Sequence, residues 1–361
     1  MKKLLGLWVI LACLGVAPLL ARTWTDRSGQ FTVEAELIDY VDGNVTLKKQ
    51  DGSIVTLPLS KLSFKDQRWL REELKRRREA ETEVAVAETN SDAADNGDWP
   101  RWRGPNNDGL SPATGLLAAW PEEGPPLAWS VRGLGDGFSS VSIAKGKIYT
   151  MGRTDGSTSL VCRKLEDGSE LWATRVGGGD RPNCTPTVDV DANLVFGLTH
   201  AGDLLCADAT TGEAKWRKNY KNDFGGRMMS GWGYSESPLV DGDLLICTPG
   251  GDKAVVVALN KKTGDLVWAT QADGLGGAGY ASPIVSDAAG VKQYLTLTGR
   301  GLIGVAAENG KLLWHYDRIA NGTANIPTPI VKGDFVFCST GYDDGGTGLI
   351  NGVGTPDYRL F

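Results

Sequence analysis

Short apolar runs and polar turns alternate along residues 140–350, at the lengths that β-strands and tight turns require. The clearest stretch has Asp-Gly or Gly-Asp turns between its apolar runs, and glycine accepts the positive φ of such turns without penalty. It predicts antiparallel strands over residues 237–240, 244–248, 254–259 and 265–268. A proline recurs at the start of the first strand, where it removes no hydrogen bond from the ladder; these prolines are Pro186, Pro238, Pro283 and Pro329, with Val141 in the first repeat.

Each group of four strands ends in the same phrase, a glycine, three further residues and then a tryptophan. The tryptophans are Trp172, Trp216, Trp268 and Trp314, which are 44, 52 and 46 residues apart. A period of this size indicates stacked units rather than one irregular core. Units of four short antiparallel strands are the blades of a β-propeller. We therefore predict that the tryptophans are structural and pack between blades, each burying about 200 Å².

The chain before the repeats divides into three parts. Residues 1–21 have the basic tip and apolar stretch of a secretory signal peptide, which predicts an exported, periplasmic or extracellular protein. An uncleaved membrane anchor is the alternative, although the apolar stretch is short for a membrane span. Residues 22–70 are predicted to form a small β domain: residues 22–62 alternate like a strongly bent β-sheet or barrel, and a capping box from Ser63 to Asp66 then opens a helix. Residues 71–97 are predicted to form a charged helix and a flexible linker.

Two stretches resemble known families. The segments from Trp24 to Ala35, Val45 to Lys49 and Leu57 to Ser63 resemble the Sla1 homology domain 1, an SH3-like module that binds short peptide motifs in endocytic adaptors. This resemblance implies peptide or polymer binding, or a structural cap without a ligand. The phrase from Ala207 to Trp216 resembles the repeat of exported bacterial quinoprotein-type propellers, as do the stretches 98–109 and 232–238. The second resemblance covers residues 98 to about 350.

The propeller resemblance implies seven or eight blades, and the repeats supply fewer. The sequence predicts an all-β, incomplete propeller of about four and a half blades over residues 98–361, because no Gly-x-x-x-Trp follows Phe335. We interpret the array as truncated. The strand at Trp129 is predicted either to lie unpaired on an open arc or to join the fragment after Phe335 in a small closed ring. An open arc exposes a strand edge and a blade face, and this predicts self-association.

Composition narrows the function. The net charge of −6 gives no reason to bind nucleic acid. Equivalent cysteines in stacked blades are too far apart for disulfides, so we interpret them as small buried residues. The two histidines, His200 and His315, have no metal-ligand spacing to cysteines or carboxylates, and we predict no metal ligands and no catalytic residues.

Surface recognition is the remaining candidate. The segments before each first strand line one mouth of a propeller, and they mix aromatic with polar side chains. We predict binding there by Phe138, Arg181, Asn183, Trp232, Tyr234, Glu236, Tyr280 and Asn325. Alternatively, the aromatic members fill the channel wall.

The sequence therefore favours an exported, non-catalytic scaffold that binds protein, peptide or polysaccharide at the cell envelope, without a cofactor and without a membrane span after signal cleavage. One alternative is a quinone-dependent dehydrogenase, or a degenerate relative, which would need PQQ and calcium. The resemblance implies adjacent cysteines for that class, and this chain has none. Another alternative is an adaptor for outer-membrane protein assembly.

Overall fold

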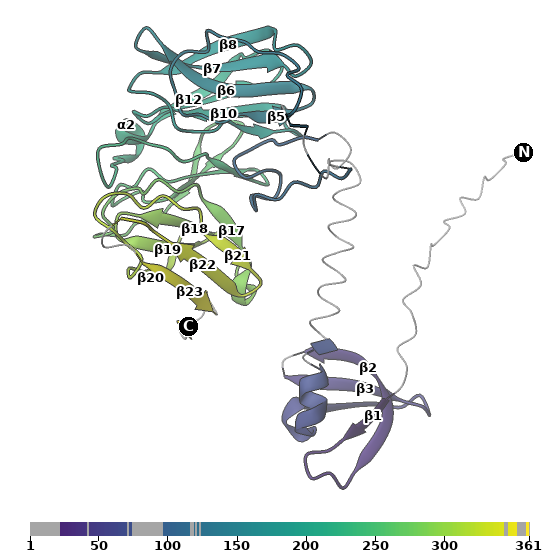
Figure 1. Cartoon of the computed structure of the whole chain (residues 1–361). Coiled ribbons are helices and arrows are strands. Elements are labelled where there is room, and N and C mark those ends of the chain that lie inside the picture. Colours follow the sequence, from purple (N-terminus) through teal and green to yellow (C-terminus); the bar gives the residue numbers. More distant parts are fainter. Residues whose placement is uncertain are drawn as a thin grey trace, which may run out of the picture. The chain divides into compact units, whose positions relative to one another are not determined.

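The computed structural model describes residues 22–41, 43–70, 72–73, 97–115, 119, 121–122, 124–342, 346–351 and 359–360. The chain forms two compact units, residues 1–92 and 93–361. The described parts of both are built mainly from β-strands (Figure 1), which confirms the predicted all-β class. The predicted signal peptide and most of the charged segment lie outside the described residues. In the described part of the chain, no helix is long and apolar enough to cross a membrane.

The first unit is a four-stranded antiparallel sheet with a short helix. Its strands, in spatial order, are β1 (Arg22–Thr25), β2 (Thr32–Val41), β3 (Asn44–Lys49) and β4 (Ile54–Pro58), followed by the 3₁₀ turn η1 (Leu59–Lys61). Alternate residues of β3 are buried, so that Leu47 lies in the core beside Leu37 and Trp24. The Trp24 indole donates to the carbonyl of Ala35 at 3.0 Å.

The predicted capping box begins the helix over residues 64–70. Ser63 Oγ donates to Asp66 Oδ2 at 2.7 Å and accepts from the Asp66 backbone N–H at 3.2 Å. Asp66 is buried and also pairs with Arg22 at 2.5 Å. The Arg22 guanidinium in turn lies 4.0 Å from the centre of the Trp69 ring. One ion pair thus joins the first strand to the helix.

The second unit contains five four-stranded antiparallel sheets, each with its strands in chain order. Blade 1 is β5 (Ser142–Ala144), β6 (Lys147–Thr154), β7 (Ser157–Lys164) and β8 (Glu170–Gly177). Blade 2 is β9 (Thr187–Asp189), β10 (Leu194–Leu198), β11 (Asp203–Asp208) and β12 (Ala214–Asn219). Blade 3 is β13 (Leu239–Asp241), β14 (Leu244–Cys247), β15 (Val257–Asn260) and β16 (Leu266–Ala269). Blade 4 is β17 (Ile284–Ser286), β18 (Gln293–Thr298), β19 (Gly301–Ala306) and β20 (Leu312–Tyr316).

The fifth blade extends beyond the half blade that the sequence predicted. It contains β21 (Ile330–Lys332), β22 (Phe335–Ser339), β23 (Thr347–Asn351) and the two-residue β24 (Arg359–Leu360). The last two strands were missed because no tryptophan marks their end. Val336 and Cys338 pack toward blade 4, whereas Ile330, Phe335 and Phe337 are each about half exposed. Self-association through this face stays a prediction.

The repeated tryptophan lies on the repeated glycine of the next blade. Trp172 covers Gly212, Trp216 covers Gly264 and Trp268 covers Gly310. These glycines all have positive φ, and a Cβ on any of them would lie less than 3 Å from the covering indole. The glycine is therefore required twice, for the turn and for the close approach. Trp314 donates to Gln293 Oε1 of its own blade at 2.7 Å and lies in one buried cluster with Val336 and Cys338 of blade 5.

Trp129 makes the same contact on blade 1, where no preceding blade exists in the described chain. Its ring covers Gly168, and its Nε1 donates to the Leu165 carbonyl at 3.0 Å. The indoles of Trp216 and Trp268 donate to the carbonyls of Lys261 and Ala307, at the same position in their turns. The segment belongs to no described sheet, as the unpaired arrangement predicts, and it packs on blade 1. It pairs with no described strand of blade 5, so the predicted pairing with the fragment after Phe335 is not found in the described residues.

An axial segment, residues 98–102, crosses the innermost strands. Trp99 pairs with Ile143 of β5, and the Pro100 carbonyl accepts from Val188 of β9 at 2.7 Å. Arg101 Nη1 donates to the Val240 carbonyl of β13 at 3.2 Å, and Trp102 Nε1 donates to Thr328 Oγ1 at 3.3 Å. This segment therefore links blades 1, 2 and 3 to the residues that begin blade 5.

Candidate functional site

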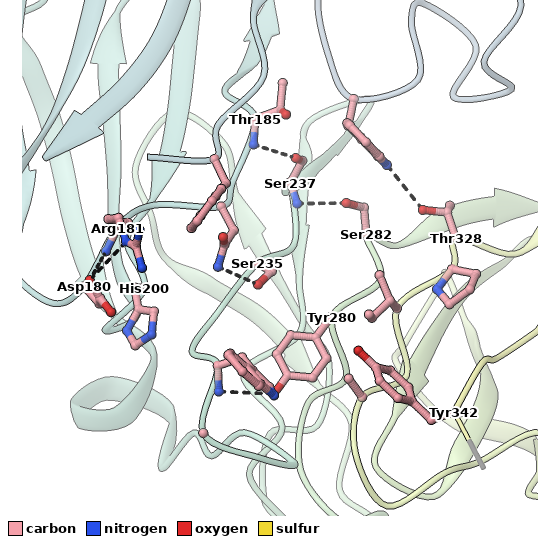
Figure 2. Close-up of a pocket in the computed structure, with 18 residues that line it drawn as sticks. Asp180, Arg181, Thr185, His200, Ser235, Ser237, Tyr280, Ser282, Thr328 and Tyr342 are labelled. Carbon is pink, nitrogen blue, oxygen red and sulfur yellow. Dashed lines mark hydrogen bonds and ion pairs between the residues drawn. The ribbon is translucent and has the colours of Figure 1, made fainter. Parts of the chain in front are cut away.

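A cavity of about 750 Å³ opens on the side of the propeller where the chain approaches each innermost strand. Figure 2 shows its lining, which comes from all five repeats and from the axial segment. The side chains combine aromatic rings, hydroxyls and one amide with the charged pair Asp180 and Arg181. Its lining residues are Trp102, Phe138, Asp180, Arg181, Asn183, Thr185, His200, Gly231, Trp232, Ser235, Ser237, Tyr280, Ser282, Ala324, Ile326, Pro327, Thr328 and Tyr342.

Five of the eight predicted binding residues lie together in this lining. They are Phe138, Arg181, Asn183, Trp232 and Tyr280. The rings of Phe138 and Trp232 are each 66% exposed, so they can contact a ligand. The Arg181 guanidinium lies 4.9 Å from the centre of the Phe138 ring and covers one of its faces.

The other three predicted residues, Tyr234, Glu236 and Asn325, are buried below the cavity and do not line it. The Tyr234 hydroxyl donates to the Pro249 carbonyl at 3.0 Å, and Asn325 Nδ2 donates to the Thr298 carbonyl at 2.8 Å. Both side chains satisfy backbone groups inside the unit. The sequence placed them on the correct segments, but adjacent residues of an extended segment point in opposite directions.

Sequence reasoning missed several lining residues, including Thr185, Ser237, Ser282 and Thr328. A signal was present, since each of these hydroxyl residues immediately precedes one of the recurrent prolines. The Thr185 backbone N–H donates to Ser237 Oγ at 3.1 Å, and the Ser237 backbone N–H donates to Ser282 Oγ at 2.9 Å. These bonds join neighbouring blades around the axis (Figure 2).

Glu236 is the most deeply buried carboxyl near the cavity. Its Oε1 accepts from the Tyr220 hydroxyl at 2.6 Å and from the Thr248 backbone N–H at 2.8 Å, while its Oε2 has no hydrogen-bond partner among the described residues. Tyr220 belongs to α2 (Tyr220–Phe224), a helical turn that the sequence analysis did not predict. Burial raises the pKa of Glu236 above its ordinary value, although the two donors partly oppose this effect.

Replacing Glu236 by glutamine is expected to reduce the pH dependence of stability. Because the pKa of Glu236 is higher in the folded than in the unfolded chain, the folded chain binds more protons above about pH 4.5. The free energy of unfolding of the unmodified protein should therefore fall as pH rises from there through the folded pKa. Urea unfolding at a series of pH values checks this. If the free energies of unfolding of the two proteins differed by the same amount at every pH in that range, the prediction would be wrong.

The cysteine thiols in the described residues are buried and protonated at neutral pH. All five cysteines in the described residues are free, as the interpretation as small buried residues requires. Burial raises the pKa of Cys162 to about 11 and that of Cys184 to about 12. These thiols therefore supply no thiolate for catalysis at neutral pH.

The lining does not fit a quinone cofactor with calcium. Such a cofactor carries several carboxylates, and calcium needs several oxygen ligands. In the described lining the one Lys or Arg side chain is Arg181, whose Nε lies 3.7 Å from Asp180 Oδ1, and Asp180 is the one carboxylate. No three His, Cys, Asp or Glu side chains cluster in a metal-binding arrangement in the described residues.

A family model described as "Outer membrane protein assembly factor BamB" (PQQ_2) matches residues 155–351. The chain belongs to the PQQ_2 family. A second model, described as "SLA1 homology domain 1, SHD1", matches residues 17–78. These matches confirm both resemblances that were drawn from the sequence.

Similar proteins cover parts of this PQQ_2 chain. The actin cytoskeleton-regulatory complex protein sla1 of Schizosaccharomyces pombe is 49% identical over 45 residues, 12% of this chain and 3% of that protein. The protein of the same name from Yarrowia lipolytica is 45% identical over 49 residues, 14% of this chain and 4% of that protein.

Solved structures of similar proteins include BamB from Moraxella catarrhalis, 17% identical with a TM-score of 0.46 over 63% of this chain and 62% of that one. The quinohemoprotein alcohol dehydrogenase from Comamonas testosteroni is 15% identical, with a TM-score of 0.48 over 72% of this chain and 47% of that one. This chain spans less than two thirds of the length of each of these relatives.

Proposed function

We propose that this protein is an exported, non-catalytic binding module, and that its propeller holds a protein or polymer ligand in the cavity at its mouth. The observation that carries the proposal is the gathering of exposed aromatic rings and hydroxyls from five repeats around one cavity of about 750 Å³. Cavities of this size with a few convergent polar groups are typical ligand sites. The basic and apolar sequence of residues 1–21 supports export.

The hydrogen bonds of the lining support binding rather than catalysis. Ser235 Oγ accepts from Asn183 Nδ2 at 3.1 Å, and the Tyr280 hydroxyl shares a 2.5 Å hydrogen bond with Ser230 Oγ. A hydroxyl becomes a nucleophile when it is hydrogen-bonded to a base such as a histidine or a carboxylate. In the described lining no hydroxyl is hydrogen-bonded to His200 or to a carboxylate. These bonds fix the shape of the cavity and leave its hydroxyls unactivated.

Binding to two arrays, one of soluble oligosaccharides and one of decapeptides of mixed sequence, tests the proposal. We expect the full chain to bind at least one probe, and Trp232→Ala to weaken that binding by at least about tenfold because the exposed ring is lost. Phe335→Ala is the control, since Phe335 is exposed on blade 5 and does not line the cavity. No binding on either array, or equal loss in both variants, would contradict the proposal.

A protein-assembly adaptor is the second candidate, favoured by the description of the matching family as an outer membrane protein assembly factor. Binding on the peptide array alone would support it. A titration with PQQ and calcium, followed by quinone absorbance, tests the dehydrogenase alternative, and a stoichiometric complex would overturn the non-catalytic proposal.

A further inference from the structure

The cavity has a polar floor. Thr185, Ser237 and Ser282 are each at most 5% exposed, and they lie side by side through the bonds between their backbone N–H groups and hydroxyls. Figure 2 shows these residues in one row that continues to Thr328. The positions are equivalent in successive blades, so the propeller repeat itself generates a row of hydroxyls around the axis.

These hydroxyls retain hydrogen-bonding capacity. A hydroxyl has one proton and two lone pairs, and Ser282 and Thr328 each use one lone pair, for the Ser237 N–H and the Trp102 indole. In the described structure no hydrogen bond uses their protons, and none involves the Thr185 hydroxyl. Ser237 differs, because its hydroxyl also lies against the Cys184 thiol. Asn183 donates an amide N–H to Ser235, and its side-chain carbonyl oxygen can still accept a hydrogen bond. The floor thus offers both donors and an acceptor.

The apolar groups lie at the rim and are held in place. Arg181 covers one face of Phe138 and leaves the ring 66% exposed. The Tyr280 hydroxyl accepts from the Trp232 backbone N–H at 3.4 Å and bonds Ser230, which in turn donates to the Thr323 carbonyl at 2.8 Å. These bonds fix the segment that carries Trp232. The Phe138 ring and the backbone segment that carries Trp232 are therefore positioned before a ligand arrives, which reduces the entropy lost on binding.

The distribution of polar and apolar groups identifies the chemical class of the ligand. A peptide usually anchors an apolar side chain in an apolar pocket, and here the deepest part of the cavity is lined by hydroxyls. The Asp180 and Arg181 charges compensate each other, so the described lining favours no strongly charged ligand. A pyranose carries hydroxyls that donate and accept around its edge and C–H groups that pack on aromatic faces.

We propose that the cavity binds a neutral oligosaccharide, with Thr185, Ser282 and Asn183 hydrogen-bonded to sugar hydroxyls and with Phe138 and Trp232 packed against sugar rings. This inference rests on the proposed function, because it names the ligand class of the same cavity.

Calorimetric titration of the full chain with cellohexaose, mannohexaose, xylohexaose and chitohexaose tests the inference. We expect at least one of them to bind with a Kd between micromolar and millimolar, and Trp232→Ala to weaken it by at least about tenfold. Thr185→Val removes a hydroxyl but keeps the shape, and it should weaken binding by roughly fivefold to tenfold without changing the thermal midpoint. Phe335→Ala should bind like the unmodified protein.

The remaining outcomes separate the two proposals. If no hexasaccharide binds but an arrayed decapeptide binds and loses affinity in Trp232→Ala, the oligosaccharide inference is wrong and the proposed function stands. If neither kind of probe binds, both are wrong. If a hexasaccharide binds equally well to Trp232→Ala and Thr185→Val, the sugar lies elsewhere and the inference is overturned.

Discussion

Replacing Gly310 by alanine is expected to lower the free energy of unfolding of the propeller unit by about 3 kcal/mol. Gly310 has a φ of +72°, and a Cβ there would lie 2.3 Å from an atom of the Trp268 ring. The ring would have to leave its site, where it is 9% exposed and donates to the Ala307 carbonyl at 3.1 Å. The substitution thus adds a packing defect between blades 3 and 4 to the strain of the turn.

Gly146→Ala is the matched control. Gly146 has a φ of +69°, and a Cβ there would have nothing within 4 Å, so only backbone strain of about 1 kcal/mol is expected. Urea unfolding of the full chain, followed by tryptophan fluorescence, measures both losses. Equal losses in the two variants would show that the contact between tryptophan and glycine does not stabilise the array.

Replacing Lys261 by methionine is expected to cost about 3–5 kcal/mol. Lys261 Nζ lies 2.5 Å from Asp189 Oδ2, and the two side chains are 10% and 6% exposed. The substitution leaves the Asp189 carboxylate buried with only part of its compensating charge, which Arg101 of the axial segment supplies. Breaking a buried pair by removing one partner is costly because the other charge stays desolvated.

Lys262→Met, at the exposed neighbouring position, should change stability by less than about 0.5 kcal/mol. The double variant Asp189→Asn with Lys261→Met should recover part of the loss, since it removes the stranded charge. Thermal and urea unfolding of the three variants check this. A double variant less stable than Lys261→Met alone would show that the isolated carboxylate is not the cause.

The blades could be predicted from the repeat because its glycine is required both by the turn in its own blade and by the tryptophan of the preceding blade. Gly212 must adopt positive φ for its turn, and it must also lack a Cβ beneath Trp172, so both residues recur in the sequence. The fourth strand of blade 5 carries no such pair and could not be predicted. Trp129 contacts Gly168 in the same way. This contact could not be predicted, because no glycine stands four residues before Trp129 to mark it as a member of the repeat.

The sequence predicted which segments surround the cavity, but it predicted only some of the side chains that line it. The exposed rings of Phe138 and Trp232 follow from the position of loops at a propeller mouth, whereas the burial of Glu236 depends on Tyr220 in an unpredicted helical turn. The hydroxyl row depends on bonds between blades about 50 residues apart, such as the one from Thr185 to Ser237. Sequence periodicity shows that such positions are equivalent but does not show that they meet.

The axial segment also constrains how the protein reaches its native state. Trp102 bonds Thr328 across 226 residues of chain, and Arg101 reaches Val240 across 139. Contacts so distant in sequence raise the contact order and slow folding, because a long loop must close before they form. Residues 98–102 are synthesised before every blade that they touch, so the bonds of Arg101 and Trp102 can form only after Val240 and Thr328 have been synthesised.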